Sequence, residues 1–397
     1  MIRLNGRRAS AGAAVVLALV LASCSSSGTS TTGTTPPGHQ SASAAARAST
    51  PAYKGMGPHP VGTYTTALGD GRRVVVWYPA AASVAKEPTE TFDIASLLSP
   101  KLQSQIPAKL RPQYPIDAHP GAPPAPGGPF PIVLFSHGYA GFPEQSADLV
   151  THLASWGFVV IAPDHVERSL SGLLGTAANG VPPLTDPTVL SRSLDAVIAD
   201  SKRPASPVHG LLDVSKVAVT GHSAGAEAAY TEATSDPRIK AFISYSVSLG
   251  GEDGKGKIPP VPKVPGMVML GTADTIIPPA ATRMIFAGMH APKYQVQIGG
   301  AGHLVFSDIC EIGKAQGGVV SLVHQAGLDI PSSLLRLASD GCQKGALSPL
   351  DAFPAIDHLS VAFLRYELGI DKQPVGLDPS VTKAFTTAPI TLIADPG

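Results

Sequence analysis

Short apolar segments alternate with segments of helical spacing along most of the chain. Apolar residues, many of them β-branched, predict strands at residues 61–68, 73–78, 132–136, 158–162, 216–220, 241–245, 266–270 and 294–298. A Gly-rich turn at residues 69–71 predicts that the first two strands form a hairpin. Between later strands, helical spacing predicts helices at residues 145–156, 189–201 and 224–234. This alternation predicts an α/β fold with a mostly parallel central sheet and helices on both faces, and ligands at the carboxyl ends of the strands.

Three segments rich in proline and glycine interrupt the alternation. They are predicted to be insertions, at residues 85–129, 167–187 and 311–349. Each contains a pair of leucines: Leu97-Leu98, Leu173-Leu174 and Leu334-Leu335. Such segments pack as ordinary surface loops or close over a site as a lid, and the pattern favours neither. In the first insertion, residues 92–110 have helical spacing that Pro100 and Pro107 interrupt.

The N-terminus has the pattern of an export signal. Three arginines within the first eight residues precede an apolar run at residues 11–22, which is too short to span a bilayer. The run ends in Leu21-Ala22-Ser23-Cys24, which resembles the signal of a bacterial lipoprotein. The resemblance implies cleavage after residue 23, a lipid on the Cys24 sulfur and attachment to the outer face of the cell membrane. An ordinary secretory signal with a chance cysteine is the alternative.

The remaining chain divides into a tether and a folded part. Residues 24–50 consist mainly of Ser, Thr, Gly, Ala and Pro, and such a composition predicts a flexible tether because it buries too little apolar surface to fold. Residues 51–397 are predicted to form one α/β domain.

Charge and composition exclude two classes of protein. The 397 residues include 29 Lys and Arg and 29 Asp and Glu, so no excess of positive charge points to a nucleic acid partner. No apolar run reaches the roughly 18–20 residues of a membrane-spanning helix, which excludes a polytopic membrane protein. We expect a monomer.

The candidate chemistry centres on Gly221-His222-Ser223-Ala224-Gly225. The pattern Gly-x-Ser-x-Gly is weak evidence alone, but here a predicted strand precedes it and a predicted helix follows it. A tight turn between strand and helix needs glycines where a Cβ would collide with backbone, and it places a serine hydroxyl at the helix N-terminus. Ser223 is therefore the candidate nucleophile.

A serine nucleophile needs a base, and the base needs a carboxylate that fixes its tautomer. Asp274 follows the strand at 266–270, and His303 follows the strand at 294–298 in a Gly-rich loop. These positions predict Asp274 as the acid and His303 as the base. Asp253 and Asp308 are alternative acids, whereas His222 and His137 are predicted to have structural roles.

Acyl transfer also needs donors for the oxyanion. The backbone N–H of Ala224 is one candidate because it follows the nucleophile. The second candidate is the N–H of Tyr139, in the loop after the strand at 132–136. A simple turn between strand and helix is the alternative explanation of that loop.

These motifs together resemble a known superfamily. Phe135-Ser136-His137-Gly138, Ala162-Pro163-Asp164-His165 and the turn at Ser223 are similar to α/β-hydrolases grouped around platelet-activating-factor acetylhydrolase, dienelactone hydrolase and cutinase-like polyester hydrolases. The resemblance implies an α/β-hydrolase fold for the domain and the cleavage of ester bonds. Two features depart from these relatives: dienelactone hydrolases use a cysteine nucleophile, and Ala224 lacks the large side chain usual in polyester hydrolases.

Two cysteines remain once Cys24 is assigned to a lipid. An even pair in an exported chain predicts a disulfide between Cys310 and Cys342, and no spacing typical of a zinc site favours metal binding. His358, within a predicted amphipathic C-terminal helix, is predicted to be structural. We expect no metal and no cofactor.

The sequence therefore predicts a surface-anchored serine carboxylic-ester hydrolase that acts on short- to medium-chain acyl or lipid esters. A catalytically silent lipoprotein that binds a ligand, a polyester hydrolase and a serine peptidase are the alternatives.

Overall fold

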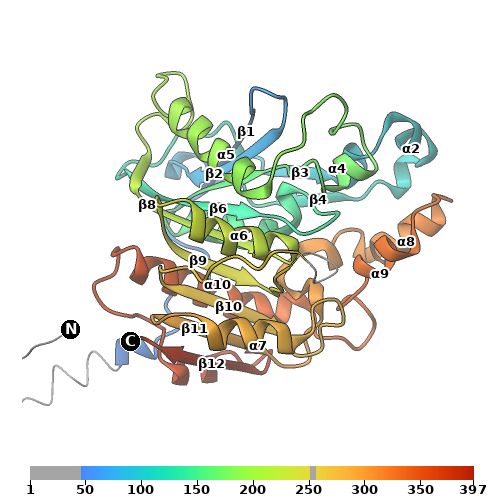
Figure 1. Ribbon diagram of the computed structural model, residues 1–397. Coiled ribbons are helices and arrows are strands. Elements are labelled where there is room, and N and C mark those ends of the chain that lie inside the picture. Colours follow the sequence, from blue (N-terminus) through green and yellow to red (C-terminus); the bar gives the residue numbers. More distant parts are fainter. Residues whose placement is uncertain (1–45, 251–255) are drawn as a thin grey trace, which may run out of the picture.

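A ten-stranded sheet runs through the computed structural model, which describes residues 46–250 and 256–397 (Figure 1). In sheet order, its strands are β12 (Ile390–Asp395), β11 (Lys293–Ile298), β10 (Gly266–Gly271), β9 (Ile239–Tyr245), β8 (Leu212–His222), β6 (Phe130–Ser136), β7 (Val159–Pro163), β2 (Arg73–Pro79), β1 (Val61–Ala67) and β5 (His119–Pro120). The strands from β7 to β11 are parallel, and β1 and β2 form the predicted antiparallel hairpin. The predicted α/β fold is confirmed.

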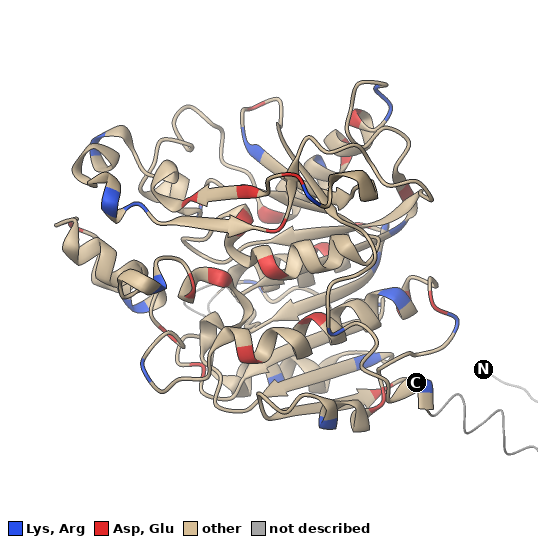
Figure 2. Cartoon of the chain, turned by 180° about the vertical axis from the view of Figure 1, so that it is seen from behind, with Lys and Arg blue, Asp and Glu red and all other residues tan. Residues whose placement is uncertain are grey.

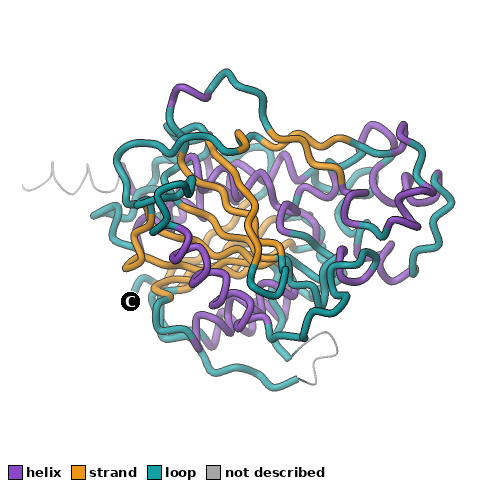
Figure 3. The backbone as a smooth tube through the Cα atoms, turned by 90° about the horizontal axis from the view of Figure 1, so that it is seen from above, coloured by secondary structure: helices purple, strands orange, loops and turns teal. Residues whose placement is uncertain are grey.

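Helices cover both faces of the sheet (Figure 3). One face packs against α3 (Ala147–Ser155) and α10 (Pro349–Glu367), and the other against α5 (Asp186–Asp200), α6 (Ala224–Ser235) and α7 (Pro279–Gly288). Successive side chains of a strand point to opposite faces. Val75 and Trp77 therefore belong to the first core and Val74 and Val76 to the second. Burial on both faces is why these strands are apolar throughout.

The first insertion is built differently from its prediction. In place of one interrupted helix, residues 90–116 form a strand pair, β3 (Glu90–Asp93) with β4 (Gln113–Ile116), around the short helices η2 (Ile94–Leu97), α2 (Pro100–Gln105) and η3 (Ala108–Leu110). Pro100 lies in the first turn of α2, where its missing N–H has no helical partner in any case. Proline therefore starts a new helix here.

Several other elements lie outside the predicted set. The edge strand β12 pairs antiparallel with β11. The second and third insertions form α4 (Leu170–Leu173), α8 (Gly318–Gln325) and α9 (Ser332–Leu337). The remaining short helices are η1 (Ala82–Val84), η4 (Pro143–Ser146), η5 (His303–Phe306), η6 (Asp308–Cys310), η7 (Lys314–Gln316) and η8 (Pro379–Ala384).

The folded part begins before residue 51. The amides of Gly376 and Asp378 donate to the carbonyl oxygens of Arg47 (3.1 Å) and Ala48 (3.0 Å). The predicted signal, Cys24 and the tether up to residue 45 lie outside the described residues. In the part of the chain that is described, no helix combines the length and apolarity needed to cross a membrane.

Charged residues are interspersed over the surface elements. In Figure 2, Lys and Arg are scattered among Asp and Glu over helices and loops, as the balanced composition of 29 basic and 29 acidic residues leads one to expect.

Candidate active site

Ser223 lies in the tight turn between β8 and α6. Its backbone has φ 59° and ψ −121°, a conformation rare for a residue with a side chain. The Ser223 amide donates to the carbonyl of Tyr245 on the neighbouring strand (2.9 Å), which holds the turn in place. A Cβ on Gly225 would lie 2.0 Å from the Ser136 carbonyl oxygen, so only glycine fits there. The turn has the geometry that the Gly-x-Ser-x-Gly pattern predicts.

Asp274 and His303 are brought together at the carboxyl ends of β10 and β11. His303 Nδ1 lies 2.9 Å from Asp274 Oδ2, and both side chains are buried. The other oxygen of Asp274 accepts from the amides of Ile276 (2.9 Å) and Ile277 (2.8 Å). Burial raises the pKa of Asp274, but the hydrogen bond and charge of His303 and the backbone donors outweigh burial and hold this pKa below its ordinary value. Asp274 is thus an ionised acceptor for His303 Nδ1–H.

The second ring nitrogen of His303 remains free of hydrogen bonds within the described residues. His303 Nε2 is buried and has no hydrogen-bond partner among the described residues. His303 and Ser223 line the same small pocket. Because Nδ1–H donates to Asp274, Nε2 is the nitrogen that can accept a proton from a hydroxyl.

The alternative acid Asp308 is bonded away from His303. Asp308 is buried and accepts from the Tyr114 hydroxyl (2.6 Å) and the Asp148 amide (3.1 Å). Burial and the nearby Asp148 raise its pKa to about 7. Asp253 lies outside the described residues.

The two predicted oxyanion donors flank Ser223. Tyr139 lies in the loop after β6, and Ala224 begins α6. Neither backbone amide has an acceptor among residues 46–250 and 256–397. A Cβ on Gly138 would lie 3.3 Å from Ser223 Cβ, so the loop backbone packs directly against the nucleophile. Both amides are therefore available near the position of a developing oxyanion.

Arg168 binds the backbone of the loop that contains Tyr139. Its guanidinium donates to the carbonyl oxygens of His137 and Gly138 (2.9 Å) and to Ser136 Oγ (2.9 Å), and it pairs with Asp186 (3.0 Å). The sequence analysis did not identify Arg168, because it belongs to the second insertion and no motif marks it.

Two histidines near the site have structural positions, as predicted. His222 Nδ1 accepts from the Gln145 side chain (3.1 Å), and His222 Nε2–H donates to the carbonyl of His303 (3.0 Å). Burial and the neighbouring His303 lower the pKa of His222 to about 3. Burial, followed by the charge of Arg168, holds the pKa of His137 well below its ordinary value. Both imidazole rings are therefore uncharged near neutral pH and have structural hydrogen bonds.

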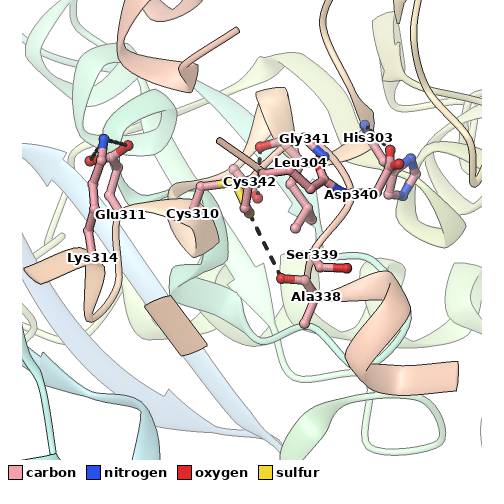
Figure 4. Close-up of a disulfide and its surroundings, with 12 residues drawn as sticks. His303, Leu304, Cys310, Glu311, Lys314, Ala338, Ser339, Asp340, Gly341 and Cys342 are labelled. Carbon is pink, nitrogen blue, oxygen red and sulfur yellow. Dashed lines mark hydrogen bonds and ion pairs between the residues drawn. A yellow bond between two sulfur atoms is a disulfide. The ribbon is translucent and has the colours of Figure 1, made fainter. Parts of the chain in front are cut away.

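The predicted disulfide between Cys310 and Cys342 is formed, and it closes a segment that also contacts the base (Figure 4). Asp340 Oδ2 accepts from the His303 amide (2.6 Å), and Oδ1 accepts from Thr275 Oγ1 (2.5 Å). Asp340 thus joins the loop of the base to the loop of the acid. The sequence analysis missed Asp340, whose one signal is its place two residues before Cys342.

His358 also has a structural position, because its ring nitrogens bind the Tyr53 amide (3.1 Å) and the Gly376 carbonyl (3.1 Å). Burial lowers its pKa to about 4. Within the described ranges, no group of three or more His, Cys, Asp and Glu side chains is arranged to hold a metal ion.

Comparisons with known proteins agree with the architecture. The sequence model for platelet-activating factor acetylhydrolase, isoform II, matches residues 44–174, and the model for chlorophyllase matches residues 110–259. The structure of a ferulic acid esterase from Streptomyces cinnamoneus superposes with a TM-score of 0.56 at 20% identity, over 85% of this chain and 97% of that chain. The chain has the α/β-hydrolase fold.

Two curated proteins are similar to this chain in sequence. A putative carboxymethylenebutenolidase of Methylorubrum extorquens is 27% identical over 213 residues, which cover 51% of this chain and 69% of that protein. Chlorophyllase type 0 of Chenopodium album is 26% identical over 143 residues, which cover 34% of this chain and 37% of that protein. The predicted resemblance to this group of α/β-hydrolases is confirmed. The homologues of this chain are hydrolases that act on ester bonds.

Proposed function

We propose that this α/β-hydrolase is a serine carboxylic-ester hydrolase that acts through an acyl-enzyme on short- to medium-chain acyl or lipid esters. The observation that carries the proposal is the state of His303, whose Nδ1 is bound to Asp274 while Nε2 is buried without a partner among the described residues, and Ser223 lines the same pocket. An imidazole held in this way is set to accept a proton from a serine hydroxyl.

The reaction follows from these positions. Ser223 Oγ attacks the ester carbonyl carbon while its proton passes to His303 Nε2, and Asp274 stabilises the resulting imidazolium. The amides of Tyr139 and Ala224 stabilise the negative charge on the carbonyl oxygen. The C–O bond to the alcohol then breaks, and the alcohol leaves with the proton from His303. Water attacks the acyl-enzyme by the same proton transfers, which releases the carboxylic acid and restores Ser223.

Two further features favour negative charge at the oxyanion position. Ala224 begins the 12-residue helix α6, whose N-terminus carries partial positive charge. The buried Arg168 guanidinium donates to the Gly138 carbonyl, which belongs to the same peptide group as the Tyr139 N–H. Because these groups are fixed before substrate binds, they need no rearrangement during the reaction.

We also propose that the enzyme is held at the outer face of the cell membrane by a lipid on Cys24. The support is the lipoprotein-like sequence that ends at Cys24 and the disulfide, since disulfides persist in oxidising compartments outside the cytosol.

The test is labelling with a fluorophosphonate together with hydrolysis of p-nitrophenyl butyrate. Ser223→Ala should abolish labelling and lower kcat on the order of 10⁶-fold, because the nucleophile is lost. Asp274→Asn should lower kcat about 10⁴-fold, because it changes the tautomer of His303. Ser235→Ala, at the exposed end of α6, is the matched control and should leave both the labelling and kcat unchanged.

Labelling of the Ser223→Ala protein at the wild-type level would refute the proposal. A wild-type protein that is neither labelled nor active would instead favour a ligand-binding lipoprotein. Full activity of Asp274→Asn would move the role of the acid to another carboxylate.

A further inference from the structure

An apolar cavity of ≈ 120 Å³ lies beside the nucleophile pocket. Every residue that lines it is apolar, and all three insertions contribute. The leucine pairs of the sequence meet here, through Leu98, Leu174, Leu334 and Leu335. In Figure 1 the helices of the insertions, α2, α4, α8 and α9, all lie at the right of the sheet. The insertions thus form a common apolar interior in place of separate surface loops.

The insertions are joined to one another by specific bonds. The Ser99 amide of the first donates to the Leu174 carbonyl of the second (2.9 Å). The Tyr114 hydroxyl of the first donates to Asp308, three residues before the third (2.6 Å). The disulfide closes the third insertion on itself. These bonds hold the segments that line the cavity in fixed positions relative to one another.

The cavity adjoins the reacting atoms. Four residues line both the cavity and the pocket that contains Ser223 and His303: Ala140, Ile309, Leu334 and Ala338. A chain attached to an ester carbonyl at Ser223 would therefore pass between these side chains into the apolar space.

Ser223 also lines a second, wider space. A cleft of ≈ 820 Å³ extends from Ser223, and its lining includes charged residues: Arg168, Asp186, Glu227 and Arg336. Ser223 thus lines both the pocket that adjoins the apolar cavity and a wider cleft in which apolar side chains are mixed with charged ones. This arrangement suits an ester with one hydrocarbon chain and a polar remainder.

We propose that the apolar cavity binds the hydrocarbon chain of the ester substrate, with the polar part of the substrate in the cleft. This proposal rests on the proposed esterase function. It adds where the hydrocarbon chain of the substrate binds and how long that chain can be. A dry apolar cavity of roughly 150 Å³ can hold a molecule of the size of benzene, so this cavity suits a chain of about six carbons. Each methylene that enters should raise kcat/KM about two- to four-fold.

The first experiment measures kcat/KM for p-nitrophenyl esters from acetate to palmitate, and for alkyl acetates from methyl to dodecyl. A peak near six carbons in the first series assigns the cavity to the acyl chain, and a peak in the second assigns it to the alcohol. Flat profiles in both series would overturn the proposal.

The second experiment changes the size of the cavity. Ala326→Phe fills it from the third insertion and should lower the ratio of hexanoate to acetate kcat/KM at least ten-fold. Leu328→Ala enlarges it and should shift the optimum to longer chains. Ala315→Phe, at an exposed position of the same insertion, is the control and should reproduce the wild-type profile. Profiles identical in all four proteins would overturn the proposal.

A binding measurement separates this proposal from the esterase function. The Ser223→Ala protein should bind hexanoate in a calorimetric titration, and the added Ala326→Phe change should weaken binding at least ten-fold. If Ser223 is required for hydrolysis of an acetate ester but neither chain length nor cavity size has an effect, the role proposed for the cavity is refuted and the esterase function stands. Hexanoate binding without any hydrolysis would refute the esterase function alone.

Discussion

At the scale of single residues, the candidate site depends on the environments that the fold gives to ordinary side chains. Asp274 is kept ionised by His303 and by two backbone amides, although it is buried. Ser223 is held at φ 59° by a bond to the neighbouring strand. Such arrangements are set before substrate arrives, which is the condition for a preorganised active site.

Another buried carboxyl group, Glu232 on α6, predicts how stability depends on pH. Burial, followed by the negative charge of Asp236, raises its pKa from 4.5 to about 8. Between these values the folded protein holds a proton that the unfolded chain has released, so the free energy of unfolding falls as pH rises from about 4.5 to about 8. Glu232→Gln should weaken this decline, as measured by urea unfolding at several pH values.

The exposed Glu87→Gln is the matched control for Glu232→Gln and should keep the wild-type dependence. An unchanged slope in Glu232→Gln would show that Glu232 ionises normally in the folded protein.

At the scale of elements, the third insertion connects stability to the site. It contains two helices, closes through the disulfide and binds the His303 backbone through Asp340. A segment that forms part of the substrate cavity and also positions the base is expected to influence both catalysis and folding.

Removal of the disulfide tests this connection. The Cys310→Ser, Cys342→Ser double variant should lose about 3–4 kcal/mol of unfolding free energy, because the unfolded chain regains the freedom of a loop with a separation of 32 residues. Its kcat should fall as well, because Asp340 would hold His303 less firmly. Urea unfolding and ester hydrolysis measure the two effects, and the wild type with a reductant should behave like the variant. Equal stability with and without the disulfide would contradict the prediction.

At the scale of the whole molecule, the proposed lipid anchor fixes where the enzyme acts. Cys24→Ser should prevent lipid attachment and move the protein from the membrane fraction to the soluble fraction, while hydrolysis of p-nitrophenyl butyrate per molecule stays the same. Cell fractionation and mass spectrometry of the N-terminal peptide measure this. A wild-type protein that carries an unmodified Cys24 in the medium would contradict it.

The strand and helix pattern of the central sheet could be predicted from the sequence because hydrophobic spacing records which side of each element is buried. The strands at β6, β7, β9, β10 and β11 and the turn at Ser223 follow from local residues in this way. The chain order of Ser223, Asp274 and His303 also follows, since each comes after a predicted strand. The pairing of Cys310 with Cys342 needed only the count of cysteines.

The tertiary structure alone decided which distant groups meet. Arg168 behind the oxyanion loop and Asp340 on the His303 amide are bonds between segments far apart in the sequence, and no local spacing encodes them. The edge strand β12 is only half-buried, so its hydrophobic signal is weak and its pairing with β11 fixes it. In the sequence, the leucine pairs of the three insertions are equally consistent with a lid and with ordinary surface loops. The structure packs these leucines together around one cavity, because apolar surface is buried wherever the chain can bring it together.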